Sequence, residues 1–403
     1  MLKAQNNWEK KIVLFFVSQS ITLFGSQIVQ MAIVWYVTLS TARGIWVAAF
    51  SICSYLPQFL ISFAGGVWAD RYNRKRMILY ADASIAIVTF GMFLILPYIS
   101  QSGILLGMLL AMSVLRSLGA GIQSPAVNAA IAQIVPKEHL MRYNGMNSSM
   151  QAAVQFFAPA VAGVVLTMGT LRSTLMIDIF TAIIGIGLFS HIRMPKSEKQ
   201  KASASTVFSD IKTGIQYAFG KPLIGGLLMV YGLFTFFCVP AGYLSGLFVS
   251  RVYGETYWYL TAVELCGFGG MMTGGLLMSV SGGFKKRRTT MFIGLAVFGG
   301  MAIGMGAVKQ FVLYLAFMVI YGVALTTVQT TINTSLQVHT ESVVQGRVFG
   351  FIGSMYAVCY PAGMTVFGLM ADRIPLQWIM EASGIVLILM SIYIAAKRDL
   401  QDM

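Results

Sequence analysis

The feature that most constrains this chain is a series of apolar runs, each about as long as a membrane-spanning helix. A helix needs about 20 mainly apolar residues to cross roughly 30 Å of hydrocarbon. Twelve such spans are predicted in the 403 residues, at 12–38, 44–68, 77–99, 102–123, 143–168, 171–193, 222–247, 256–281, 289–308, 311–335, 348–371 and 375–396. Hydrophobic residues make up 57% of the chain and charged residues only 10%, which excludes an ordinary soluble domain. The predicted fold class is an all-α integral membrane protein.

The positions of the cations explain the net charge of +14. With the N-terminus in the cytoplasm, 22 of the 28 Lys and Arg lie in inner segments. Arg116 lies inside a span, and the outer loops hold Arg43, Arg172, Arg251, Lys309 and Arg373. Such an excess of cytoplasmic cations sets the orientation of membrane proteins. We therefore expect a bacterial inner-membrane protein with both termini in the cytoplasm, and lipid headgroups rather than nucleic acid beside the basic loops.

Cysteine and histidine indicate neither metal nor redox chemistry. The four cysteines, Cys53, Cys238, Cys266 and Cys359, lie in apolar spans without a Cys-x-x-Cys pair, so they are expected to be small core residues. No nucleophile–base cluster and no phosphate-binding Gly-Lys loop is found in the sequence. We expect no enzyme activity and no cofactor, while an ATPase partner stays open.

One long polar segment, residues 194–221, divides the spans six and six. Within it, Val207, Ile211, Ile215 and Phe219 recur every four residues, which predicts an amphipathic helix on the inner membrane surface. The predicted domains are a six-helix bundle in 1–193, this linker, and a second bundle in 222–403. The halves resemble each other in their glycine and proline spacing, which favours two pseudo-symmetric bundles around a central cavity, as in secondary transporters.

A short charged stretch between the second and third spans carries a family motif. Gly66, Asp70, Arg71, Arg74 and Lys75 match the signature Gly-x-x-x-Asp-Arg/Lys-x-Gly-Arg-Lys/Arg of the major facilitator superfamily. The chain thus resembles that superfamily, which implies the major facilitator fold. Within it, stretches such as "VQMAIVWY", "SPAVNAAI" and "TAVELCGFGGMM" resemble the drug-exporter group that contains the macrolide-efflux proteins.

The chain departs from the motif at one position and from its repeat at another. Asn73 replaces the second glycine, and Asn tolerates the left-handed backbone of a tight turn. Ser279 stands at the place of Asp70 in the second half. The resemblance implies that Asp70 lies against the inner start of span 11, near Arg347, and latches the halves in the outward-open state.

Two other family signatures are partial. The stretch "RSLGAG" places Arg116 before a glycine-rich turn, and "APAVAG" keeps Pro159 and Gly163 of an element that exporters carry. Alanine stands at the two other glycine positions of that element. The resemblance therefore supports export as the direction of transport.

Charged residues inside the spans are candidates for coupling, because a charge in the bilayer faces a partner or a wet cavity. Arg116 either holds a nearby carboxylate ionised until a proton or the drug arrives, or forms a fixed ion pair between helices. Asp178 and Glu264 either exchange protons, or pair with a cationic drug, or join helices by hydrogen bonds. Asp82 is assigned to the cation network of the gating motif, and Glu381 is the weakest candidate.

Polar and aromatic residues predict where a substrate cavity lies, since spans 1, 4, 7 and 10 line it in this superfamily. The expected lining residues are Gln19, Gln27, Gln30, Tyr231, Phe234, Phe237, Gln329 and Asn333. A large, weakly charged cavity suits an amphiphilic small molecule. Hydrogen bonding between helices is the alternative explanation of the polar residues.

The favoured function is export of an amphiphilic drug, of macrolide type, by proton antiport with alternating access, carried out by a monomer. Export of tetracycline, and export or flipping of an endogenous amphiphile such as a siderophore or a lysophospholipid, are the alternatives. A non-transporting sensor is the alternative from another functional class.

Overall fold

The computed structural model describes residues 2–136, 139–192, 194, 221–281, 286–340 and 345–396. These ranges are helical, with turns between the helices and no strand among them. Ten helices are long and apolar enough to cross a membrane, and two shorter apolar helices, Pro222–Phe237 and Met355–Ala371, complete the twelve expected segments. The predicted all-α membrane fold is confirmed. The amphipathic helix expected within 194–221 lies outside the described residues.

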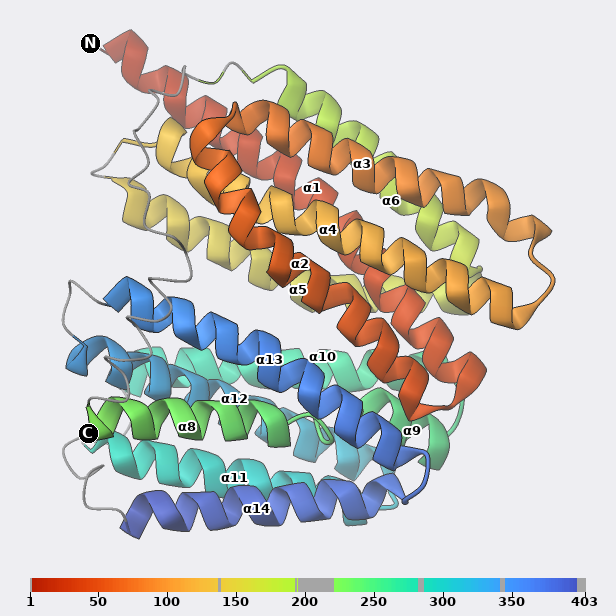
Figure 1. Cartoon of the computed structure of the whole chain (residues 1–403), viewed down its shortest axis with the longest axis vertical. Helices are drawn as coiled ribbons and strands as arrows, with labels where there is room; N and C mark the ends of the chain where they lie inside the picture. The colour runs from red at the N-terminus through yellow and green to blue at the C-terminus, as the bar shows by residue number, and fades with distance from the viewer. Residues whose placement is uncertain are drawn as a thin grey trace. The chain divides into compact units, whose positions relative to one another are not determined.

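The chain forms two compact units. The first contains Met1–Val37 and Ala49–Ser203. Its helices are α1 (Leu2–Thr41), α2 (Gly44–Arg71), α3 (Arg74–Ile95), the short η1 (Leu96–Tyr98), α4 (Ser102–Ile134), α5 (Leu140–Met168) and α6 (Leu171–Ser190), shown from red to yellow-green in Figure 1. Helix α3 packs against both α4 and α6. Part of the core, which includes Phe15, Ile78, Ala130 and Phe189, lies among α1, α3, α4 and α6.

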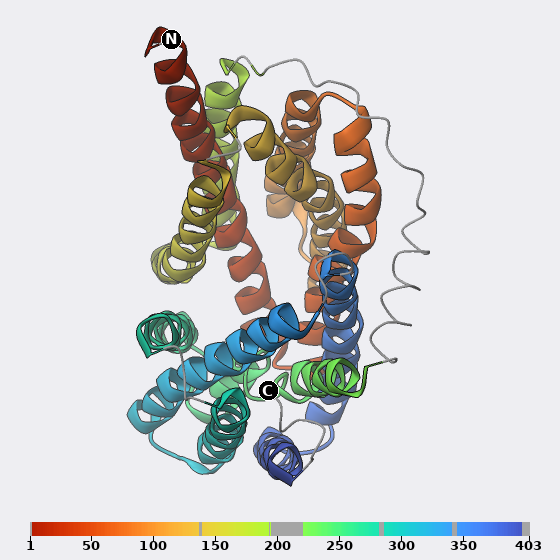
Figure 2. The ribbon, with the colours of Figure 1, turned by 90° about the vertical axis from the view of Figure 1, so that its left-hand side faces the viewer.

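The second unit contains Thr38–Ala48, the connection between α1 and α2, and Ala204–Met403. Its helices are α8 (Pro222–Phe237), α9 (Ser245–Val252), α10 (Tyr257–Ser281), α11 (Arg287–Ala307), α12 (Phe311–His339), α13 (Gln345–Ala371) and α14 (Leu376–Ala396). Helix α11 packs against α12 and α14, and α12 also packs against α10. Helices such as α8 and α14, which run across Figure 1, are seen end on in Figure 2.

Glycines set the closest helix contacts in the second unit. A Cβ atom on Gly270 of α10 would lie 3.1 Å from the Cα atom of Gly322 on α12, and one on Gly299 of α11 would lie 2.5 Å from the carbonyl oxygen of Gly384 on α14. Small residues at membrane helix interfaces let the backbones approach, because lipid supplies little hydrophobic driving force between helices. The glycines of these helices therefore serve packing.

Span 7 is not the continuous helix predicted at 222–247. Helix α8 ends at Phe237, residues 238–244 form turns, and α9 begins at Ser245. Pro240 has no backbone N–H, and the amide of Leu244 bonds the carbonyl of Val239, five residues back, at 3.1 Å. The Tyr321 hydroxyl donates to the Cys238 carbonyl at 3.2 Å and so satisfies a backbone acceptor at the break. Pro159 and Pro361, by contrast, lie inside the continuous helices α5 and α13.

Candidate functional site

Two cations of the motif between α2 and α3, Arg74 and Lys75, bind main-chain carbonyls of the first unit. Arg74 donates from Nε to the Ala69 carbonyl of α2 at 3.0 Å and from a terminal nitrogen to the Ala129 carbonyl of α4 at 3.1 Å. Lys75 donates to the last residue of α6, the Ser190 carbonyl, at 2.6 Å. Cations are favoured at helix C-termini, where carbonyls lack helical partners. Arg74 and Lys75 thus connect α2, α4 and α6 at the start of α3.

Asn73 acts differently from the expectation. Its backbone is extended, with φ −68° and ψ 109°, so the left-handed conformation is not used. Its side-chain oxygen instead accepts from the Arg76 amide at 3.2 Å and caps the start of α3. The glycine that needs close approach is Gly65, where a Cβ atom would lie 2.8 Å from the Gly121 carbonyl oxygen, whereas a Cβ on Gly66 would meet open space.

A buried ion pair joins α4 to α6. Arg116 and Asp178 are 8% and 1% exposed, and a terminal nitrogen of Arg116 donates to Oδ2 of Asp178. The same nitrogen contacts the Thr89 hydroxyl of α3, which itself donates to Asp178 Oδ2 at 3.0 Å. The Ser26 hydroxyl of α1 donates to the other carboxylate oxygen, Oδ1, at 3.3 Å. The pair is therefore charge-compensated and held by residues from four helices.

Thr89 is not among the residues predicted from the sequence. Thr89 is fully buried and lies seven residues after Asp82, on the same face of α3. The seven-residue spacing between Asp82 and Thr89, two polar residues in an apolar span, is the sequence signal that predicts a shared helix face.

Asp82 lies in a second polar cluster of the first unit. It is 1% exposed, and its Oδ1 accepts from the side-chain amide of Gln123 on α4. The same Gln123 nitrogen lies 3.4 Å from Oε1 of Gln19 on α1. Asp82 therefore bonds the Gln123 amide. Among the described residues no cation of the motif between α2 and α3 bonds it, which corrects its expected assignment to that cation network. The side chains of Asp70 and Arg347 lie outside the described part of the structure, so the expected contact between them stays a prediction.

Glu264 of α10 is the candidate carboxyl of the second unit. Its side chain is partly buried. Among the described residues no hydrogen bond or ion pair reaches it, in contrast to Asp178. Tyr314 of α12 interacts with it electrostatically.

The expected lining residues divide into two groups. Phe234 is 1% exposed and packs on Phe298, with ring centroids 4.9 Å apart, so it is a core residue of the second unit and not a cavity wall. Gln19 is also buried. The others, Gln27, Gln30, Tyr231, Phe237, Gln329 and Asn333, are partly buried. Pro159 and Gly163 are buried in α5.

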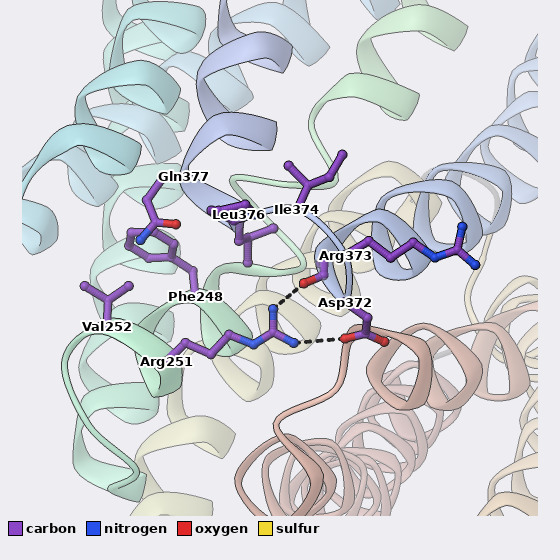
Figure 3. Close-up of a pocket in the computed structure, with 10 residues that line it drawn as sticks. Phe248, Arg251, Val252, Asp372, Arg373, Ile374, Leu376 and Gln377 are labelled. Atoms are coloured by element: carbon purple, nitrogen blue, oxygen red, sulfur yellow. Dashed lines mark hydrogen bonds and ion pairs between the residues drawn. The ribbon is translucent and has the colours of Figure 1, made fainter.

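A charged network stands at one end of the second unit (Figure 3). Arg251 at the end of α9 bonds Asp372 at 2.9 Å and also donates to the carbonyls of Ala42 and Ala371. Asp372 in turn accepts from the amide of Gly44, the first residue of α2, at 2.6 Å. Beside the network lies a cavity of about 270 Å³, lined by residues of α9 and of the α13–α14 connection.

Comparison with known proteins agrees with this architecture. The chain is 26% identical over 394 residues to Macrolide efflux protein A of Streptococcus pyogenes, covering 97% of this chain and 96% of the relative. It is 23% identical to the Enterobactin exporter EntS of Escherichia coli O1:K1, over 72% of this chain and 68% of that one. The solved structure of the nucleoside transporter NupG superposes with a TM-score of 0.73 at 13% identity, covering 95% and 98% of the two chains.

The family profile described as Major Facilitator Superfamily matches residues 15–364, most of the chain. The twelve apolar helical segments, the basic motif between α2 and α3 and the superposition on a transporter of that fold all agree with the match. The chain therefore belongs to the Major Facilitator Superfamily of membrane transporters.

Proposed function

We propose that this transporter exports a macrolide-type drug in exchange for protons. The observation that carries the proposal is the similarity to Macrolide efflux protein A over nearly the whole length of both chains. Charged groups within the helices of both units, namely Asp178, Glu264 and Arg116, are the candidates for coupling to protons or to the charge of the drug.

In this proposal the halves at 1–193 and 222–403 alternate access to a cavity that loads the drug from the cytoplasm. Both termini face the cytoplasm, because the inner segments carry most cations. The protein works as a monomer, and Asp70 in the gating motif stabilises one of the two states. Replacement of Asp70 by Asn is then expected to raise the labelling of cysteines introduced on the inner side. Unchanged labelling and unchanged transport would refute the gating role.

Proteoliposomes with a macrolide test the function. An imposed pH gradient is expected to drive erythromycin against its own concentration gradient, and a protonophore is expected to abolish the movement. Movement that ignores the gradient contradicts antiport, and no movement at all contradicts macrolide transport. Expression in an efflux-deficient host is expected to raise the inhibitory concentration of erythromycin.

The similarity to the Enterobactin exporter EntS favours one second candidate, export of a siderophore. The same vesicles loaded with enterobactin separate the two functions. Gradient-driven movement of enterobactin without movement of erythromycin would replace the macrolide proposal.

A further inference from the structure

The two membrane carboxyls proposed for coupling have opposite surroundings. Asp178 is compensated by Arg116 and accepts from two hydroxyls, so each of its oxygens is occupied. Glu264 has neither a cation nor a donor among the residues that the structure describes. An ionised carboxylate inside a membrane protein needs such a partner, since burial of an unpaired charge is unfavourable. The two groups therefore cannot play the same part.

The second unit contains another polar group without a partner among the described residues, the hydroxyl of Tyr314 on α12. Tyr314 is fully buried, and its hydroxyl has no hydrogen-bond partner in the described part of the chain. Its ring is fixed by Phe248, which stacks on it with centroids 5.5 Å apart and planes 15° from parallel. A buried tyrosine hydroxyl usually finds a partner, so an unpaired one needs an explanation.

The register of α10 against α12 brings Glu264 and Tyr314 together. Gly270 lies against Val319 and Gly322, and Gly274 lies against Val323 and Thr326, so contacting residues of α12 are 49 to 52 positions later in the chain. One turn nearer the start of α10, Gly267 packs on Met318, an offset of 51. Continued by one more turn, this register sets Glu264 at the level of Tyr314 and Leu315. Glu264 lies three residues before Gly267 and so shares the face of α10 that contacts α12.

The other titratable groups near this contact are engaged elsewhere. Helix α10 packs against α12 and α9. Arg251 of α9 binds Ala42, Ala371 and Asp372. Tyr253, directly after α9, donates to the Val308 carbonyl at 2.7 Å. Tyr314 is thus the group positioned to donate a hydrogen bond to an ionised Glu264.

We propose that Glu264 is the residue that binds and releases the exchanged proton, and that Tyr314 is the positioning residue that donates a hydrogen bond to its carboxylate form. The inference rests on the proposed proton antiport. When Glu264 is protonated, the carboxylic acid is neutral, so its burial without a partner costs less free energy than burial of the carboxylate. When it gives its proton to water, a rotation of the glutamate side chain brings the carboxylate to the Tyr314 hydroxyl, which keeps its own proton. Asp178 keeps its ion pair with Arg116 throughout.

Proton release on drug binding tests the proposal. The purified full-length protein in weakly buffered detergent is mixed with erythromycin, and the released protons are read with a pH dye. Glu264→Gln is expected to lower the release at least tenfold while erythromycin still binds. The matched control is Glu381→Gln, since Glu381 of α14 is also a partly buried carboxyl without a partner among the described residues. Wild-type release from Glu264→Gln would overturn the assignment.

The pH profile tests the part of Tyr314. Tyr314→Phe removes the hydrogen-bond donor that stabilises the Glu264 carboxylate, so the protonated form of Glu264 persists to higher pH. The midpoint of proton release is expected to move up by about one pH unit, the size expected for one hydrogen bond to a charged group. Tyr321→Phe removes a paired hydroxyl from the same helix and is expected to leave the midpoint in place. An unchanged midpoint in Tyr314→Phe would contradict the positioning role.

Infrared titration tests the proton site independently of which substrate is transported. The carbonyl band of a protonated carboxylic acid is expected to disappear with rising pH in the wild type without any drug present. Its Glu264 component should be missing in Glu264→Gln and shifted in Tyr314→Phe. Absence of erythromycin binding would refute the proposed function and leave this titration intact, whereas absence of the Glu264 component would refute the proton site itself.

Discussion

The guanidinium of Arg116 on α4 donates to the carboxylate of Asp178 on α6, and the two residues are 8% and 1% exposed. Thr89 and Ser26 complete the bonds of the carboxylate from α3 and α1. Removing one member of such a pair leaves the other charge uncompensated. Asp178→Asn is therefore expected to lower the free energy of unfolding by about 3–5 kcal/mol, measured by chemical denaturation in detergent micelles.

The control for this prediction replaces both charges. Arg116→Met combined with Asp178→Leu removes the pair without leaving a charge behind, so its stability should lie near that of the wild type. If Asp178→Asn were as stable as the wild type, Arg116 would have another partner and the fixed pair would be wrong.

The network of Arg251 and Asp372 anchors the start of α2. Asp372 accepts from the amides of Gly44 at 2.6 Å and Ile45 at 3.0 Å, which are unpaired donors at a helix N-terminus. Asp372→Ala removes a cap worth about 1 kcal/mol, so hydrogen exchange of these amides is expected to rise about fivefold. Arg373→Gln changes the neighbouring cation, which points away from the network in Figure 3, and should leave both exchange rates unchanged.

Gly270 tests the close contact between α10 and α12. A Cβ atom there would lie 2.9 Å from the carbonyl carbon of Val319, a backbone atom that cannot rotate away. Gly270→Ala is therefore expected to cost about 1–3 kcal/mol, the usual range for overpacking, measured by thermal unfolding in detergent. Gly300→Ala on α11 meets nothing within 4 Å and should be neutral or slightly stabilising. Equal effects of the two changes would contradict the packing role.

Asn73 tests how the gating motif begins α3. Asn73→Ala removes the side-chain cap and is expected to cost about 1 kcal/mol of stability, while Asn73→Asp keeps a capping oxygen and should retain it. Asn73→Gly restores the residue of the family motif and should not stabilise the protein, because the backbone here is extended. A stabilised glycine variant would show that the left-handed conformation is used after all.

The membrane helices could be predicted from sequence because their length follows from the thickness of the hydrocarbon core, which acts on each run separately. The same reasoning failed at 238–244, where α8 stops in the middle of an apolar run. Hydropathy does not distinguish helix from turn when the residues remain apolar. The Tyr321 hydroxyl and the bond between Leu244 and Val239 that support this break come from the packed structure.

The candidate site divides in the same way. The sequence by itself determined the membrane class, the twelve apolar segments and the acidic residues to examine, since each rests on the transfer free energy of single residues or short runs. Only the tertiary structure decided that Asp178 is paired with Arg116, that Asp82 contacts Gln123, and that Glu264 has no partner among the described residues. These differences arise from the register of neighbouring helices, in which one turn of displacement exchanges one partner for another.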